Sequence, residues 1–169
     1  MKKMKKIMAL MLAAIMMMAM SVTAFAAEGA TGTLTLTVNA KGGQDLNGQT
    51  INLYKLFDVT ESGTTGSKNY AYTVNTETGY KDALVSVLTE AGKTVTAGSK
   101  DEEFATAVFD IGINDSTEVQ NFANKFTAYA LKNSLVATAT SGKITEENKT
   151  SYTFNNLAAG YYLVYVTGG

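Results

Sequence analysis

The chain has 169 residues, with 14 Lys plus Arg against 15 Asp plus Glu, and it contains no His, Cys, Pro or Trp. Without His and Cys it cannot form a Ser-His-Asp triad, a thiol nucleophile or a zinc site with imidazole or thiolate ligands. A Ser–Lys pair or paired carboxylates remain formally possible, but the sequence gives no sign of either. We therefore expect no enzyme, no metal and no other cofactor.

The first 27 residues have the three parts of an export signal. Four Lys in the first six residues form a cationic start, Ile7–Met20 is uncharged and apolar, and residues 24–26 are Ala-Phe-Ala. Small residues at alternate positions fit the pocket of a signal peptidase. A permanent membrane helix needs about 20 apolar residues, which this run does not reach. We predict a signal peptide over residues 1–27, with cleavage after Ala26 or Ala27.

Removal of this leader leaves one domain over residues 28–169 and changes the charge. Four of the 14 basic residues lie in the leader, so ten remain against 15 acidic ones, a net charge of 10 − 15 = −5. A mildly acidic chain with no basic patch argues against nucleic acid or anionic lipid as a partner. An exported domain without Cys has no disulfides, which is common in the envelope of Gram-positive bacteria.

The first part of the exported segment is predicted to be β. Gly32–Asn39 alternates Leu and Val with Thr, the pattern of a half-buried strand. The turn-rich segment Lys41–Gln49 separates it from a second strand, Thr50–Thr60. A loop tip at Gly63–Ser67 and a returning strand at Tyr70–Asn75 then complete a hairpin.

The middle of the chain is predicted to be helical, because its apolar residues recur at spacings of three and four. One helix covers Gly79–Ala91, with Thr76 or Thr78 as N-cap and Gly92 as the glycine that ends it. A second helix covers Thr117–Asn133.

The end of the chain is predicted to be β again. Ser151–Phe154 and Tyr161–Thr167 form strands around a turn at Asn155–Gly160, whereas Ala107–Ile113, between the helices, is ambiguous. Strands followed by helices and then strands favour an antiparallel sandwich with a helical insertion over a parallel sheet.

An acidic group in the helical part has two interpretations. Asp101-Glu102-Glu103, Asp110 and Asp115 could form a calcium cluster, but the closely spaced oxygens and sharp glycine turn of a calcium loop are missing. We interpret these residues as the solvated start of a helix, and expect no metal site.

The tyrosines also have two interpretations. An aromatic binding face is one, with the members Tyr70, Tyr72, Tyr161, Tyr162 and Tyr165. Because Tyr is a good strand residue with a polar tip, packing in the core and at its rim is the interpretation that we favour.

Lys55 is unusual because it alternates in phase with Leu53 and Phe57. The pleat would therefore point it to the apolar side, where an unpaired ammonium is costly. The alternatives are an ammonium that reaches outward from the strand, or a register in which Tyr54 and Leu56 face the core.

Three segments resemble one family. QDLNGQTINLYKLFDVT (44–60) resembles the opening of Gram-positive pilin and adhesin domains of the collagen-adhesin B type, in which an LxGxxxxLYK strand follows a turn. YTFNNLAAGYYLVYVT (152–167) is similar to their closing strands. VQNFANKFTAYALKN (119–133) resembles the insertion in the N-terminal domain of isopeptide-forming fimbrial shaft subunits. The resemblance implies a mainly β fold: an antiparallel, immunoglobulin-like β-sandwich with a two-helix insertion, preceded by the signal peptide.

Family domains often contain a Lys–Asn isopeptide bond, in which a buried Lys of an early strand attacks an Asn of the last strand and a nearby carboxylate moves protons. The chain departs from this pattern, since Leu34–Val38 has no Lys and Val166 stands where the family usually has Glu.

Lys55 is the one isopeptide candidate. Asn155 and Asn156 are its nearest acceptors by analogy, but we expect them in a turn. We expect Asp58 on the opposite face, where it is a poor proton shuttle. We therefore predict no isopeptide bond, and an unmodified Lys55 whose ammonium reaches the edge of the sheet.

The resemblance implies a structural domain of a sortase-assembled surface pilus, exported to the cell wall. Its partners would be other pilin subunits and sortase, engaged through parts of the precursor beyond Gly169, because no sorting signal or pilin-motif Lys occurs in these residues. A shaft role and a tip or minor role both stay open. The alternative is an adhesin domain that binds host matrix or glycan through its loops at Lys41–Gln49 and Ser62–Asn69.

Overall fold

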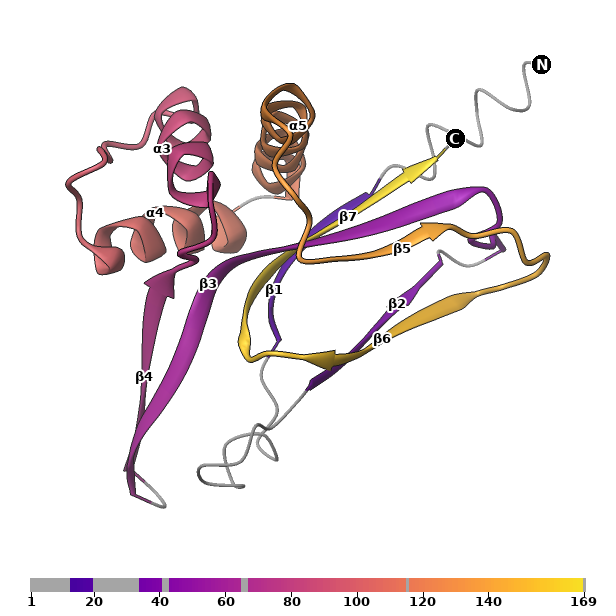
Figure 1. Ribbon diagram of the computed structural model, residues 1–169, viewed down its shortest axis with the longest axis horizontal. Helices are drawn as coiled ribbons and strands as arrows, with labels where there is room; N and C mark the ends of the chain where they lie inside the picture. The colour runs from indigo at the N-terminus through magenta and orange to yellow at the C-terminus, as the bar shows by residue number, and fades with distance from the viewer. Residues whose placement is uncertain (1–12, 20–33, 41–42, 65–66, 115, 169) are drawn as a thin grey trace.

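The computed structural model describes the chain except residues 1–12, 20–33, 41–42, 65–66, 115 and 169. The described part is mainly β, with antiparallel sheets and three helices between the fourth and fifth strands (Figure 1). In chain order the elements are β1 (Ala13–Ala19), β2 (Leu34–Asn39), β3 (Gln49–Thr64), β4 (Ser67–Val74), α3 (Tyr80–Glu90), α4 (Asp101–Asn114), α5 (Ser116–Asn133), β5 (Ala139–Lys143), β6 (Ser151–Leu157) and β7 (Gly160–Gly168). No helix in these residues is long and apolar enough to cross a membrane.

The strands form two sheets. The main sheet has the order β1-β7-β3-β4, with β5 also paired to β3, and the second sheet consists of β2 and β6. The long strand β3 therefore has β7 along one edge, and β5 followed by β4 along the other. The helices lie on one side of the main sheet and the β2–β6 pair on the other (Figure 1).

Both faces of the main sheet are buried. Strand β7 shows the division, because Leu163 and Tyr165 belong to the core under the helices, whereas Tyr162, Val164 and Val166 belong to the core under the β2–β6 pair. A central strand covered on two faces reads as a nearly continuous apolar run, and the sequence GYYLVYVT has this character.

The alternation predicted for the first strand is confirmed over β2. Leu36 and Val38 are buried, and Thr37 between them is exposed. Its hydroxyl group lies 2.9 Å from that of Thr153 on the paired strand β6, so the solvent side of this small sheet carries a cross-strand threonine pair.

Two of the helices confirm the predicted periodicity. In α3 the buried side chains are Tyr80, Ala83, Leu84, Val87 and Leu88, and α5 covers the second predicted range with buried Val119, Phe122, Ala123, Phe126 and Ala130. Gly92, with a φ of 87°, follows α3 as expected of a glycine stop.

The predicted N-cap of α3 is wrong. Gly79 holds this position with a φ of 90° and no side-chain cap. A Cβ at Gly79 would lie 2.9 Å from Leu135 Cδ1. Glycine is therefore required here both by its backbone conformation and by the close approach of the chain after α5.

The insertion contains three helices among the described residues, not two, because the ambiguous segment belongs to α4. Its buried residues Phe104, Ala107, Val108 and Ile111 have the spacing of one helix face. The Glu103 carboxylate accepts a hydrogen bond of 2.8 Å from the Lys100 backbone N–H, as in a capping box. These signals lie in the sequence, but the predicted boundary cut the segment in half.

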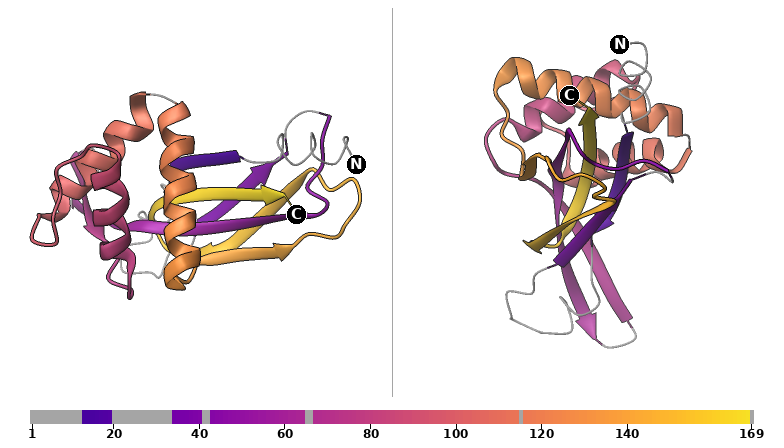
Figure 2. Two further views of the ribbon diagram at one scale, coloured as in Figure 1. Left: turned by 90° about the horizontal axis from the view of Figure 1, so that it is seen from above. Right: turned by 90° about the vertical axis from the view of Figure 1, so that its right-hand side faces the viewer.

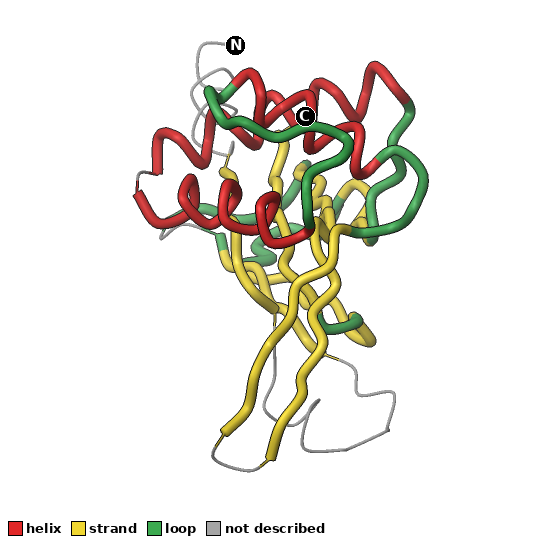
Figure 3. Tube along the Cα trace, turned by 90° about the vertical axis from the view of Figure 1, so that its left-hand side faces the viewer, coloured by secondary structure: helices red, strands yellow, loops and turns green. Residues whose placement is uncertain are grey.

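Several strand boundaries also differ from the prediction. β5 was not predicted, since its sequence ATSGK has no apolar alternation. The strands β6 and β7 leave only residues 158–159 between them. The hairpin strands β3 and β4 extend to Thr64 and Ser67, which pair with each other, so this hairpin projects far from the body (Figure 3).

Candidate functional site

The site around Lys55 begins with a gap along one edge of β3. β5 pairs with β3 as far as Leu53, and β4 pairs with it only from Phe57 onward. The backbone of Lys55 thus faces no strand on this edge. Its N–H donates to Thr138 Oγ1 at 2.9 Å, and its carbonyl oxygen accepts from Asn75 Nδ2 at 2.8 Å. Two side chains here replace the missing strand.

Asn75 is held in place for this task. Only 3% of its surface is exposed. Its Oδ1 accepts the Glu77 backbone N–H at 2.9 Å, and its own backbone N–H donates to the Leu56 carbonyl at 3.0 Å. The buried amide is therefore hydrogen-bonded at both ends, as burial of a polar group requires.

Tyr80 supports Thr138 from the start of α3. Its hydroxyl donates to the Val136 carbonyl at 2.7 Å and lies 3.2 Å from Thr138 Oγ1. Burial raises the pKa of Tyr80 to about 12, although the hydrogen bond with Thr138 acts in the opposite direction. The phenol is therefore neutral and able to donate at physiological pH.

A β-bulge lies on the other edge of β3. Lys55 pairs with Tyr162 and Phe57 pairs with Tyr161, so Leu56 is an extra residue between them. Leu56 and Phe57 are both fully buried in the core under the helices. The strict alternation expected for this strand therefore breaks directly after Lys55.

The bulge corrects the predicted position of Asp58. Its Oδ1 atom lies 2.7 Å from Lys55 Nζ, so the two charged groups meet instead of facing opposite sides. The side chain of Lys55 is only 16% exposed, and its ammonium is paired, as a mostly covered cation must be. The alternative register also holds in part, since Tyr54 and Leu56 face the helical core.

The stem of Lys55 crosses over Gly160, the first residue of β7. A Cβ at Gly160 would lie 2.7 Å from Lys55 Cδ and 2.7 Å from the Phe57 carbonyl oxygen. Glycine permits this close approach of two strands. The glycine in the closing motif thus makes room for the Lys of the opening motif.

The two expected acceptors lie elsewhere. Asn155 and Asn156 are exposed residues of β6, not turn residues as predicted. Asn155 Oδ1 accepts a hydrogen bond of 3.4 Å from Thr35 Oγ1, and Asn156 has a φ of 60°. Among the hydrogen bonds and ion pairs of the described residues, none joins Lys55 to either amide. The absence of an isopeptide bond stays a prediction.

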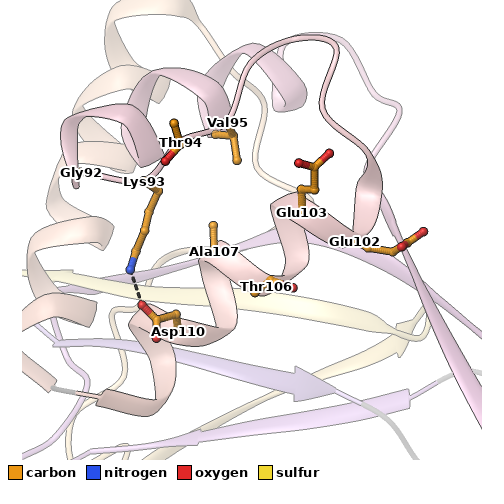
Figure 4. A pocket seen from close by; sticks show the side chains of 9 residues that line it. All are labelled: Gly92, Lys93, Thr94, Val95, Glu102, Glu103, Thr106, Ala107 and Asp110. Carbon is orange, nitrogen blue, oxygen red and sulfur yellow. Dashed lines mark hydrogen bonds and ion pairs between the residues drawn. The ribbon is translucent and has the colours of Figure 1, made fainter.

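A second candidate is a hollow of about 450 Å³ between α4 and the segment that follows α3. Figure 4 shows Lys93 reaching across to Asp110, with which it forms an ion pair, while Glu103 lies toward the other end. Glu103 already accepts from Lys100. The described residues contain no group of three or more acidic side chains placed to hold a metal ion.

The other acidic residues of the predicted calcium alternative serve the backbone or fall outside the structure. Asp101 Oδ1 accepts the Val74 backbone N–H at 3.2 Å, which ties the start of α4 to the end of β4. Asp115 lies outside the described residues, as do the predicted cleavage residues Ala26 and Ala27.

The tyrosines do not form one face. Tyr72 and Tyr161 each pack against Phe109 with ring centroids 4.8 Å apart. Tyr162 lies in the opposite core and donates to the Ala158 carbonyl at 2.6 Å, and burial raises its pKa to about 12. Tyr165 donates to Asn124 Oδ1 on α5 at 2.9 Å. The rings therefore serve packing on both sides of the sheet.

The two predicted recognition loops differ in character. In the described part of Lys41–Gln49, Leu46 is buried and its N–H donates to the Lys149 carbonyl at 2.7 Å. Asp45 also accepts from the Asn148 N–H at 3.0 Å. This loop is tied to a neighbouring loop, whereas Ser62–Asn69 forms the end of the projecting hairpin (Figure 3).

Comparison of the chain with family models, curated proteins and solved structures finds no match.

Proposed function

We propose that this chain is a structural subunit domain of a sortase-assembled surface pilus of a Gram-positive bacterium. The observation that carries the proposal is the pairing of β3 with β7. These strands contain the two segments that resemble the opening and closing motifs of pilin and adhesin domains, and they lie side by side and antiparallel (Figure 1). In finer terms, the proposed domain is an immunoglobulin-like sandwich behind a cleaved signal peptide.

The packing suits a load-bearing role. The main sheet is covered on both faces, and its central strands are hydrogen-bonded along both edges. The groups that could support chemistry are used locally: Lys55 by Asp58, Asn75 by the backbone of β3, and Lys93 by Asp110. A subunit of a filament needs this internal rigidity more than it needs an open cleft.

The proposed location and partners follow from this role. The domain would be exported, held at the cell wall, and joined to other pilin subunits by sortase through further segments of the full precursor. Neither of the two described hollows is needed for that assembly.

Immunoblotting of wall fractions tests the proposal. An antibody raised against residues 28–169 is applied to wall material released by a peptidoglycan hydrolase and boiled in SDS. A ladder of high-mass bands is expected, because covalent polymers survive boiling. Deletion of the sortase genes should reduce it to a single band. A single band in both strains would refute the proposal.

An adhesin role is the second candidate, and the projecting β3–β4 hairpin is the observation that favours it (Figure 3). Exposed loops positioned by a rigid scaffold commonly carry recognition. Replacement of residues 62–69 by a short glycine-containing turn should then abolish saturable binding to host matrix. The control replaces the exposed turn Thr96–Ser99, and binding that survives both replacements would exclude the hairpin.

A further inference from the structure

The main sheet is completed by a strand from the leader. β1 (Ala13–Ala19) lies antiparallel to β7, and the pairing runs without a shift from Ala13 opposite Val166 to Ala19 opposite Gly160. β7 is therefore a central strand, with β3 on one edge and β1 on the other. The same residues lie inside the apolar run that the sequence assigns to the export signal.

The place that β1 occupies is recessed. β1 has backbone neighbours in α5 and in β2, which belong to the layers on opposite sides of the main sheet. Figure 2 shows α5 lying across β1 and β7 when the molecule is seen from above. A strand can enter this slot, whereas a whole folded domain meets α5 and β2 first.

The wall of the slot is apolar. Opposite β1, the β7 residues Tyr162, Leu163 and Val164 are at most 1% exposed. Loss of β1 would leave a row of unpaired N–H and C=O groups beside this apolar surface, the condition under which a sheet edge accepts another strand. The matching sequence AAIMMMA carries no charge and no Pro, so it meets both requirements of the slot.

We propose that the outer edge of β7 is a strand-acceptor site whose occupant in the precursor is the leader strand Ala13–Ala19. The site takes an extended, uncharged, apolar segment antiparallel to β7, held by main-chain hydrogen bonds as in strand addition. The folded precursor thereby covers the middle of its own export signal, and cleavage cuts the covalent link that keeps this strand in place. The proposal does not depend on the pilus role.

The test uses the full chain, folded and purified, with a site-specific protease sequence inserted after Ala27 and then cut. The leader should stay bound and co-elute with residues 28–169 in size-exclusion chromatography. Hydrogen exchange followed by mass spectrometry should show protection along both edges of β7. After the leader is stripped off, about half of the Gly160–Val166 amides should lose protection, because alternate N–H groups face β1.

Two proline variants sharpen the test. Adjacent N–H groups of a strand point to opposite edges, so of Met16→Pro and Met17→Pro only one removes a hydrogen bond to β7. One variant should release the leader after cutting and the other should retain it, with the far-ultraviolet circular dichroism of the helices unchanged in both. Equal behaviour of the two variants would overturn the proposal. So would a wild-type leader that leaves at once, or equal β7 exchange before and after stripping. Since all measurements use purified protein, the presence or absence of a pilus ladder does not affect them.

Discussion

The two faces of the main sheet are covered in different ways. Under the helices the core is aromatic, with Phe57, Tyr80, Phe104, Phe122 and Phe126 almost fully buried. On the other face a two-stranded sheet covers a smaller, mostly aliphatic core. Large rings from three helices interlock from several directions, whereas a two-stranded sheet has two open edges. We conclude that the helical face supplies more of the stability and the β2–β6 face less.

The largest expected effect tests this comparison with one chemical change on each face. Phe126→Ala should lower the free energy of unfolding by about 3–5 kcal/mol, because its ring packs against Tyr54, Tyr80 and Phe122 with centroids 5.2–6.4 Å apart. Phe154→Ala on β6 should cost less, since this ring is 6% exposed. Urea titration measures both, and an equal or larger loss in Phe154→Ala would reverse the comparison.

The next effect concerns the junction where β3 changes its neighbour. Asn75→Ala leaves the buried Lys55 carbonyl without its 2.8 Å hydrogen bond, and an unsatisfied buried group costs about 1–3 kcal/mol. Asn121→Ala, at an exposed position of α5, is the matched control and should change stability little. If the two variants are equally stable, the junction does not depend on the Asn75 amide.

The tyrosines that anchor the two faces should make stability sensitive to alkali. Burial raises the pKa values of Tyr80, under the helices, and Tyr162, in the opposite core, to about 12. An unfolded tyrosine ionises near pH 10, so between pH 10 and 12 the unfolded state binds fewer protons than the folded state. Stability is therefore fully present below pH 10 and falls as the pH rises toward 12.

The measurement is the free energy of unfolding as a function of pH. Tyr162→Phe should have a shallower alkaline fall than wild type, although it loses the hydrogen bond to Ala158 at all pH values. Tyr70→Phe, at an exposed ring, is the control. Parallel curves for wild type and Tyr162→Phe would show that this phenol contributes nothing to the alkaline loss.

The smallest effect lies on the solvent side of the β2–β6 pair. Thr37 and Thr153 face each other with hydroxyl groups 2.9 Å apart. Because such exposed cross-strand pairs contribute about 0.2–1 kcal/mol, Thr37→Ala and Thr153→Ala should each cost no more than this. The double variant should cost less than the sum of the two single variants. A strictly additive result would show that the two hydroxyl groups do not interact.

The sequence predicted the elements that have one clear period. The stripe of α5 and the Leu–Thr alternation of β2 were found because each covers one face of one core. β5 was missed because its five residues pair through the backbone and bury little. The pairing of β1 with β7 has no signal of its own, since an apolar leader and a buried strand have the same composition.

The candidate site was predicted only in part. Lys55 was identified from its position among apolar residues, but its pairing with Asp58 depends on the bulge at Leu56. One extra residue in a strand reverses the facing of every later side chain, and no local pattern marked it. Asn75 and Thr138 were missed because their role depends on where two other strands end.

The central claim about this site is that Lys55 is held for packing and not for covalent chemistry. Intact-mass spectrometry of residues 28–169 tests it most directly. The account predicts the unmodified mass, with the amine free to pair with Asp58. A deficit of about 17 Da, for ammonia lost to an Asn amide, or about 18 Da, for water lost to a carboxylate, would contradict it if the deficit disappeared in Lys55→Ala.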